Sequence, residues 1–178
     1  MGKVREPQVQ FDGRQLVQAH GPHRPVRIVL HDTESHDAAG ISDIAGIANF
    51  FKAQGLGYGS HLVIDADGNT GRLVDDREIG WHVGGRNTGS LGIEQIGFAK
   101  FTKGQWASRG PQLEKVARWI AWWTKRYGIP LAHDVDRGVS THADQSRAFH
   151  TTDHTDPGGN YPLDAVLARA HVLRGTGW

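Results

Sequence analysis

The chain contains several short apolar runs that predict β-strands. "VRIVL" at 26–30 is rich in β-branched residues and predicts a buried strand that ends at His31. "HLVIDADGNTGRLV" at 61–74 predicts a β-hairpin, because an Asp-Gly pair separates two apolar runs. "LGIEQIGF" at 91–98 predicts a further strand. The predicted strands alternate along the chain with longer stretches in which the apolar residues have a different spacing.

Those longer stretches have apolar residues at helical intervals, and they predict helices at 41–55, 111–128 and 161–173. Strands interleaved with helices predict an α/β fold, with a central mixed β-sheet flanked by helices. The sheet is expected to be mixed because one connection is a tight hairpin. The chain has no internal repeat or Pro/Ser-rich linker, so we expect one domain at 25–178, preceded by a loose N-terminal arm at 1–24.

Composition narrows the function classes. The chain has 178 residues, is 38% hydrophobic and 22% charged, and carries a formal net charge of +1, as in an ordinary globular domain. A chain without a strong basic field is not expected to bind nucleic acid. The first ten residues lack the apolar region of a signal peptide, and "WIAWW" at 119–123 is too short to cross a bilayer. We therefore expect no signal peptide, no membrane insertion and no obligate assembly, hence a monomer.

Histidine is unusually frequent, with eleven histidines and no cysteine. Any metal must therefore be held by histidine and carboxylate. The segment "HADQSRAFHTTDHTDPGG" at 142–159 is expected to be a polar loop, and it gathers three histidines and three aspartates: His142, His150, His154, Asp144, Asp153 and Asp156. A hydrolytic zinc ion commonly takes three such ligands and leaves a fourth position to water. The alternative is a hydrated loop with helix-capping aspartates, but a compact cluster opposite the strand-end His31 favours a metal site.

Glu94 is a carboxylate in a predicted strand. Strand alternation places it on the face shared by Gly92 and Ile96, not among polar residues. Such a glutamate either forms a structural salt bridge or acts as an acid/base with a raised pKa. The residues alone leave both interpretations open.

Four segments, taken in order over about residues 25–170, resemble a known family. They are "VLHDTES", "GSHLVIDADG", "IGWHVGGRNTGSLGIEQIG" and "STHADQSRAFHTTDHTDPGGNYP". The set resembles the zinc-dependent N-acetylmuramoyl-L-alanine amidases of the type 2 amidase and peptidoglycan-recognition superfamily. Within that superfamily it is most similar to lysins from phages of actinobacteria.

The resemblance implies a zinc site at one rim of the sheet and two catalytic residues. His31, His142 and Asp156 match the three Zn²⁺ ligands of the family. Glu94 matches the strand glutamate that works as the catalytic acid/base, and His154 stands where many relatives have a lysine near the scissile carbonyl. A histidine there keeps a hydrogen-bond donor, but its charge depends on pH near neutrality. The implied reaction cleaves the amide between N-acetylmuramic acid and the L-alanine of the stem peptide.

The resemblance also assigns a substrate groove. Three residues fall in the loop that walls this groove in the family: Trp81, His82 and Asn87. Some relatives carry a catalytic tyrosine at the position that holds Ser60 here, so this chain resembles the branch that uses glutamate. His150 lies in the same segment as His142 and leaves open a second choice for that zinc ligand.

The resemblance implies a biological role as well. We expect a phage endolysin that is made in the host cytoplasm and acts on cell-wall peptidoglycan after release. The first alternative is a cytosolic amidase that trims recycled muropeptides. The others are a non-catalytic peptidoglycan-binding module and a purely structural metal site. Because the three ligand positions and the glutamate position are all filled, an enzyme is favoured.

Overall fold

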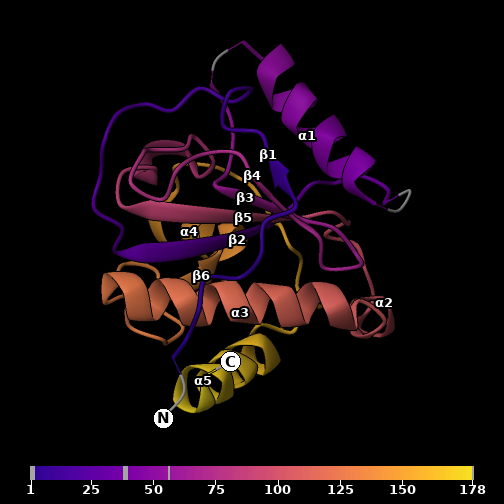
Figure 1. Ribbon diagram of the computed structural model, residues 1–178, viewed down its shortest axis with the longest axis vertical. Coiled ribbons are helices and arrows are strands. Elements are labelled where there is room, and N and C mark those ends of the chain that lie inside the picture. The colour runs from indigo at the N-terminus through magenta and orange to yellow at the C-terminus, as the bar shows by residue number, and fades with distance from the viewer. Residues whose placement is uncertain (1–2, 38–39, 56, 178) are drawn as a thin grey trace.

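A six-stranded mixed sheet forms the centre of the protein in the computed structural model, which describes residues 3–37, 40–55 and 57–177 (Figure 1). The strands lie in the order β1-β4-β3-β5-β2-β6. Their bounds are Phe11–Asp12 (β1), Arg27–Asp32 (β2), Leu62–Ile64 (β3), Thr70–Arg72 (β4), Ser90–Gln95 (β5) and Val139–Thr141 (β6). β2 pairs in parallel with β5 and β6, whereas β3 and β4 form the antiparallel hairpin that the sequence predicts. The predicted α/β fold with a mixed sheet is confirmed.

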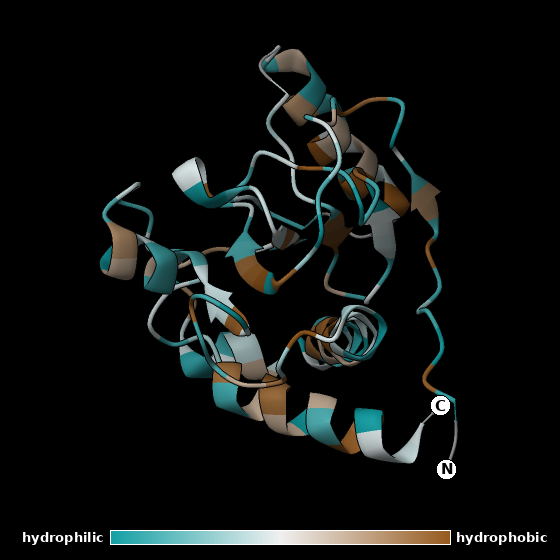
Figure 2. Cartoon of the chain, turned by 90° about the vertical axis from the view of Figure 1, so that its left-hand side faces the viewer, coloured by the Kyte–Doolittle hydropathy of each residue, from teal (hydrophilic) through white to brown (hydrophobic). Residues whose placement is uncertain are grey.

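The helices form layers on both faces of this sheet. Their bounds are Ile41–Ala53 (α1), Lys103–Ala107 (α2), Gly110–Tyr127 (α3), His142–Phe149 (α4) and Leu163–Thr176 (α5), with a short 3₁₀ helix at Gly84–Arg86. α3 lies between the sheet and α5, as both Figure 1 and Figure 2 show, and α1 lies on the opposite side (Figure 1). No helix in the described part of the chain is long and apolar enough to cross a membrane.

Strand alternation divides the core into two clusters. Ile28 and Leu30 point toward the α3 and α5 side, where three tryptophans are fully buried. Val63 and Ile96 point the other way and pack with Ile44 of α1. Burial of each such side chain contributes about 1.5–3 kcal/mol. α1 packs on β1, β3 and β4, so it lies to one side of β2 and β5. The C-terminal ends of β2 and β5 carry polar side chains on the face of the sheet that α1 covers.

The N-terminal residues are not a loose arm. β1 extends the sheet beyond β4, with hydrogen bonds of 2.8 Å from the Gln10 amide to the Thr70 carbonyl and from the Gly13 amide to the Arg72 carbonyl. Val4 and Val17 are buried. Without β1, the backbone groups of β4 would form an unpaired edge, which explains why the arm packs there. The division of the chain at residue 24 stays a prediction.

The segment 142–159 is not entirely a loop, because its first half is helix α4. Thr141 caps the helix: its side chain accepts a hydrogen bond of 3.1 Å from the Asp144 amide, and the Asp144 side chain accepts one of 2.9 Å from the Thr141 amide. This reciprocal pair is a capping box, which starts a helix without any apolar periodicity. The consequence is that His142 lies in the first turn of a helix and is held rigidly.

Candidate metal centre and active site

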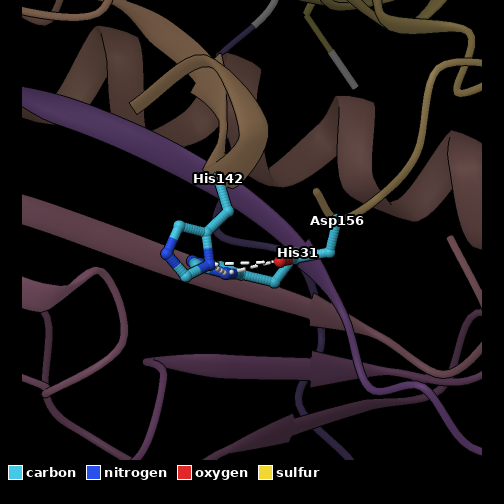
Figure 3. A group of neighbouring side chains, drawn as sticks. All are labelled: His31, His142 and Asp156. Atoms are coloured by element: carbon cyan, nitrogen blue, oxygen red, sulfur yellow. Dashed lines mark hydrogen bonds and ion pairs between the residues drawn. The ribbon is translucent and has the colours of Figure 1, made fainter. Parts of the chain in front are cut away.

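His31, His142 and Asp156 meet at the end of the sheet and could form a metal site (Figure 3). His31 comes from β2, His142 is the first residue of α4, and Asp156 lies in the loop that follows α4. The Nδ1 atoms of the two histidines are 3.1 Å apart, and they lie 3.1 Å and 3.2 Å from the Asp156 carboxylate oxygens. All three side chains are buried. The three ligands predicted from sequence are therefore brought together, and we call them the ligand group.

This donor set fits zinc. Ligands at about 2.0–2.1 Å from a tetrahedral Zn²⁺ lie about 3.3 Å from one another, close to the separations found here. The outer nitrogen of each histidine has its own partner: Nε2 of His31 lies 3.0 Å from Nδ1 of His82, and Nε2 of His142 lies 3.2 Å from Oγ1 of Thr152. With a hydrogen on each Nε2, both Nδ1 lone pairs are free and converge with the carboxylate.

The electrostatics of the ligand group suit a cation. Burial lowers the pKa of His31, so its ring is neutral near pH 7. Burial alone would raise the pKa of Asp156, but the adjacent imidazoles of His142 and His31 outweigh that effect and hold the pKa of this carboxyl below its usual range. Neutral imidazole and ionised carboxylate are the forms that bind a divalent metal.

Glu94 lies beside the ligand group. It is the β5 partner of His31 in the parallel ladder, so the two side chains share a face of the sheet, together with Ile96 as predicted. Its carboxyl is buried, and Oε2 has no hydrogen-bond partner. Burial, and then repulsion from Asp156 and Asp32, raises the pKa of Glu94 well above its usual value. No ion pair involves Glu94 among the described residues, so the acid/base interpretation is favoured over the salt bridge.

His154 lies over the ligand group on the solvent side. Its ring stacks on that of His142 with centroids 4.3 Å apart, and its Nδ1 is 3.3 Å from Oδ1 of Asp156. The His154 side chain is 59% exposed, so it can reach a substrate. His150, by contrast, is the exposed C-terminal cap of α4 and lies outside the ligand group of the described residues. The geometry favours His142 over His150 as the ligand.

A groove leads to the ligand group. It has a volume of about 680 Å³, and an adjoining hollow of about 460 Å³ shares His82, Glu94, His142 and His154 with it. Part of the groove is lined by the aromatic rim, by which we mean Phe51, Tyr58 and Trp81. The groove therefore offers aromatic surface as well as the catalytic candidates.

The three groove residues predicted from sequence have different surroundings. Trp81 is 41% exposed in the groove, and its ring stacks on His20 with centroids 3.8 Å apart. Asn87 also lines the groove, but its Oδ1 accepts hydrogen bonds of 2.9 Å and 2.8 Å from the backbone amides of His82 and Val83. His82 contacts His31 at the back of the ligand group.

Sequence reasoning missed two further residues at the site. Asp32 is buried, and burial, followed by repulsion from Glu34 and Asp156, raises the pKa of its carboxyl to about 8. Thr152 holds the outer nitrogen of His142. Asp32 could be found from the sequence, because it directly follows the predicted ligand His31. Thr152 could not, because nothing in the polar run around it distinguishes it from its neighbours.

Comparison with known proteins identifies the chain. Residues 21–159 match the sequence model of the N-acetylmuramoyl-L-alanine amidases. The chain belongs to this family. The matched range contains the three possible metal ligands, Glu94 and His154. No curated protein matches the amidase in sequence.

Solved structures support the fold of the amidase. The N-acetylmuramoyl-L-alanine amidase LysC from Clostridium intestinale is 21% identical, with a TM-score of 0.66, and the match covers 93% of this chain and 99% of that one. The Staphylococcus aureus hydrolase AmiA is 18% identical with a TM-score of 0.70, covering 98% and 90%. A mutant endolysin from Bacillus subtilis is 20% identical with a TM-score of 0.63, covering 92% and 99%.

Proposed function

We propose that the amidase is zinc-dependent and hydrolyses the amide between the lactyl group of N-acetylmuramic acid and the L-alanine of the stem peptide. The observation that carries this proposal is the convergence of two histidines and an aspartate beside the buried Glu94, which lines a groove. A purely structural metal would need no acid/base group and no access for a substrate.

His31, His142 and Asp156 would hold the zinc ion in this mechanism. When bound, zinc supplies a Lewis acid that polarises the scissile carbonyl and lowers the pKa of water beside it. Glu94 accepts the proton of the attacking water and passes it to the leaving nitrogen of L-alanine. Its burial without a hydrogen-bond partner leaves Oε2 free for this transfer, and its raised pKa lets the carboxyl hold the proton in between.

His154 would donate a hydrogen bond to the oxygen that becomes negative as water attacks the carbonyl. It is suited to this role because it lies on the solvent side of the ligand group and lines the groove as well as the hollow. Trp81 and Asn87 would contact the substrate along the groove, Trp81 through its exposed ring.

We propose further that the amidase works as a phage endolysin. On this proposal it is made in the host cytoplasm, reaches the wall after release and contributes to lysis as a monomer, with peptidoglycan as its partner and no nucleic acid. The sequence resemblance to phage lysins and the fold shared with a solved endolysin support this role. An endolysin would also be antibacterial when it is added to bacterial cells from outside.

The deciding experiment measures release of L-alanine amino termini from purified peptidoglycan, in the presence of a chelator and again after zinc is restored. We expect release that the chelator abolishes and zinc restores. The matched control is Glu94→Gln, which keeps the three proposed ligands. If zinc-loaded protein releases no amino termini, the proposed reaction is wrong and the binding-module alternative gains support.

Substrate size separates the endolysin from a muropeptide-recycling amidase. An endolysin should cleave intact sacculi at a rate comparable with its rate on soluble muropeptides. A recycling enzyme should cleave the soluble fragments and leave the sacculi almost untouched, which would contradict the endolysin proposal without affecting the assigned reaction.

A further inference from the structure

His82 was assigned to the substrate groove by sequence, but the closest polar contact of its ring is with His31. The two rings meet edge to face, with centroids 5.1 Å apart and an interplanar angle of 89°. Nδ1 of His82 lies 3.0 Å from Nε2 of His31, which is the nitrogen that faces away from the ligand group. One hydrogen must therefore lie between these two nitrogens.

Three features of the chain hold the His82 ring in this place. The ring packs over Gly92 of β5 so closely that a Cβ there would lie 2.7 Å from Nδ1 of His82. Oδ1 of Asn87 accepts hydrogen bonds from the backbone amides of His82 and Val83, which fixes the backbone on both sides of the His82 Cα atom. On the far side of the ring, Nε2 of His82 lies 3.5 Å from the carbonyl oxygen of Ser90.

The direction of the hydrogen bond follows from that last contact. A carbonyl oxygen only accepts, so Nε2 of His82 carries the hydrogen of the neutral ring. Nδ1 of His82 is then a bare acceptor, and Nε2 of His31 is the donor. A neutral His31 with its hydrogen on Nε2 has its lone pair on Nδ1, where Asp156 and His142 lie.

We infer that His82 is a positioning residue for the metal ligand His31. It accepts the Nε2 hydrogen of His31, fixes the tautomer and orientation of that ring, and so presents Nδ1 to the zinc ion. This inference rests on the proposed zinc dependence. Metal-bound histidines usually donate to a carboxylate, a carbonyl or water. An imidazole acceptor performs the same task without adding a fourth carboxyl group to the site that already holds Asp156, Glu94 and Asp32.

The inference explains two features of "WHVGGRNTGSLGIE" that catalysis alone does not require. Gly92 is needed because any side chain would displace the His82 ring. Asn87 is needed because its side chain replaces the missing backbone partners of two consecutive amides. Both residues thus act on the metal site through His82.

The first test requires no metal. In metal-free wild-type protein at a pH where the rings are neutral, two-bond ¹⁵N–¹H correlation spectra identify which nitrogen of each histidine is protonated. We expect both His31 and His82 to carry the hydrogen on Nε2. A His31 ring protonated on Nδ1 would overturn the inference, whatever the protein does with zinc.

The second test compares zinc affinity in two variants by competition with a chromogenic chelator. His82→Leu fills a similar volume without an acceptor, and we expect about 10- to 100-fold weaker binding, the range for such outer partners. His82→Asn places Oδ1 near the position of Nδ1, and we expect affinity within a few-fold of wild type. His20→Ala removes a ring that stacks on Trp81, outside the ligand group, and is the control that should leave zinc affinity unchanged.

Melting temperatures of the metal-free variants separate positioning from a merely structural role. Both substitutions remove the ring from Gly92, so both should lower the melting temperature while only His82→Leu loses zinc affinity. Equal loss of affinity in the two variants, or no loss in His82→Leu, would refute the positioning role. Wild-type protein that binds no zinc would instead contradict the proposed function, and the metal-free spectra would still decide the His82 contact.

Discussion

Asp32, Glu94 and Asp156 place three carboxyl groups in one small site, and their surroundings differ. Asp156 is flanked by two imidazoles, which lower its pKa despite its burial. Asp32 and Glu94 each have a buried oxygen with no hydrogen-bond partner, and burial raises the pKa of both. An unpartnered buried carboxylate is costly to ionise. The same chemical group is therefore suited to be an anionic ligand at one position and a proton carrier at another.

Glu94→Gln should abolish most of the amide hydrolysis and leave the fold intact. The amide has the same shape but cannot take up a proton, so we expect a fall in kcat of about 10²- to 10⁴-fold, the usual contribution of a general acid/base. Removing one of three crowded acids should not lower the melting temperature. Steady-state hydrolysis and thermal unfolding check both points, and a parallel loss of activity and melting temperature would mean that Glu94 acts structurally.

His154→Ala should lose activity while keeping zinc, because the three proposed ligands are unchanged. Loss of one donor to a developing oxyanion costs about 10²- to 10³-fold in kcat. His150→Asn is the matched control, since asparagine tolerates the left-handed backbone at φ 54° and His150 lies outside the ligand group. Hydrolysis rates and zinc content measure the outcome, and a fully active His154→Ala variant would rule out its assigned role.

At the scale of elements, the site depends on strand register and on one helix cap. The parallel register of β2 and β5 places Glu94 beside His31, and β6 leads directly into α4 with His142 in the first turn. β2, β5, α1, α3 and α5 could be predicted because their apolar patterns are strong. β6 has only three residues, and α4 has few apolar residues, so neither has a period that sequence reasoning detects.

The packing of α5 on α3 includes an ion pair whose contribution should depend on pH. Arg169 and Arg118 donate hydrogen bonds to Glu114 and lower its pKa from 4.5. A carboxyl with a depressed pKa in the folded state adds stability above about pH 4.5, and that stability is lost as the pH falls through the folded-state value. Because the pair is partly exposed and Arg169 is open to solvent, its contribution to stability is small.

Glu114→Gln should therefore lower the melting temperature at pH 7 and have a smaller effect near pH 3. Thermal unfolding of wild type and variant across this range measures the difference. Glu78→Gln is the control, since this exposed glutamate makes no side-chain ion pair among the described residues. A Glu114 effect that is equal at both pH values would show that the packing of the side chain matters, and not its charge.

At the scale of the whole molecule, the possible ligands come from segments 111 and 125 residues away from His31. Sequence reasoning found all three because an ordered set of motifs identified the family. It could not find the contact between His82 and His31, nor the close packing of His82 on Gly92. Those contacts depend on how a loop folds over a strand, and residue types alone do not determine that.

Zinc should stabilise the folded amidase as a whole, because the ion would tie β2, the start of α4 and the loop at Asp156 together. At a free zinc concentration 100 times the Kd, a ligand of the folded state adds about 2.7 kcal/mol to the free energy of unfolding. For a domain of this size that corresponds to a rise in melting temperature of roughly 5–10 °C.

This rise should disappear in His142→Asn and persist in His150→Asn, because His142 lies in the ligand group and His150 does not. Thermal unfolding of each protein with and without zinc, and again after chelation, measures the effect. If His142→Asn keeps the full zinc-dependent rise while His150→Asn loses it, the ligand assignment is reversed. If neither variant loses it, the stabilising ion binds elsewhere on the amidase.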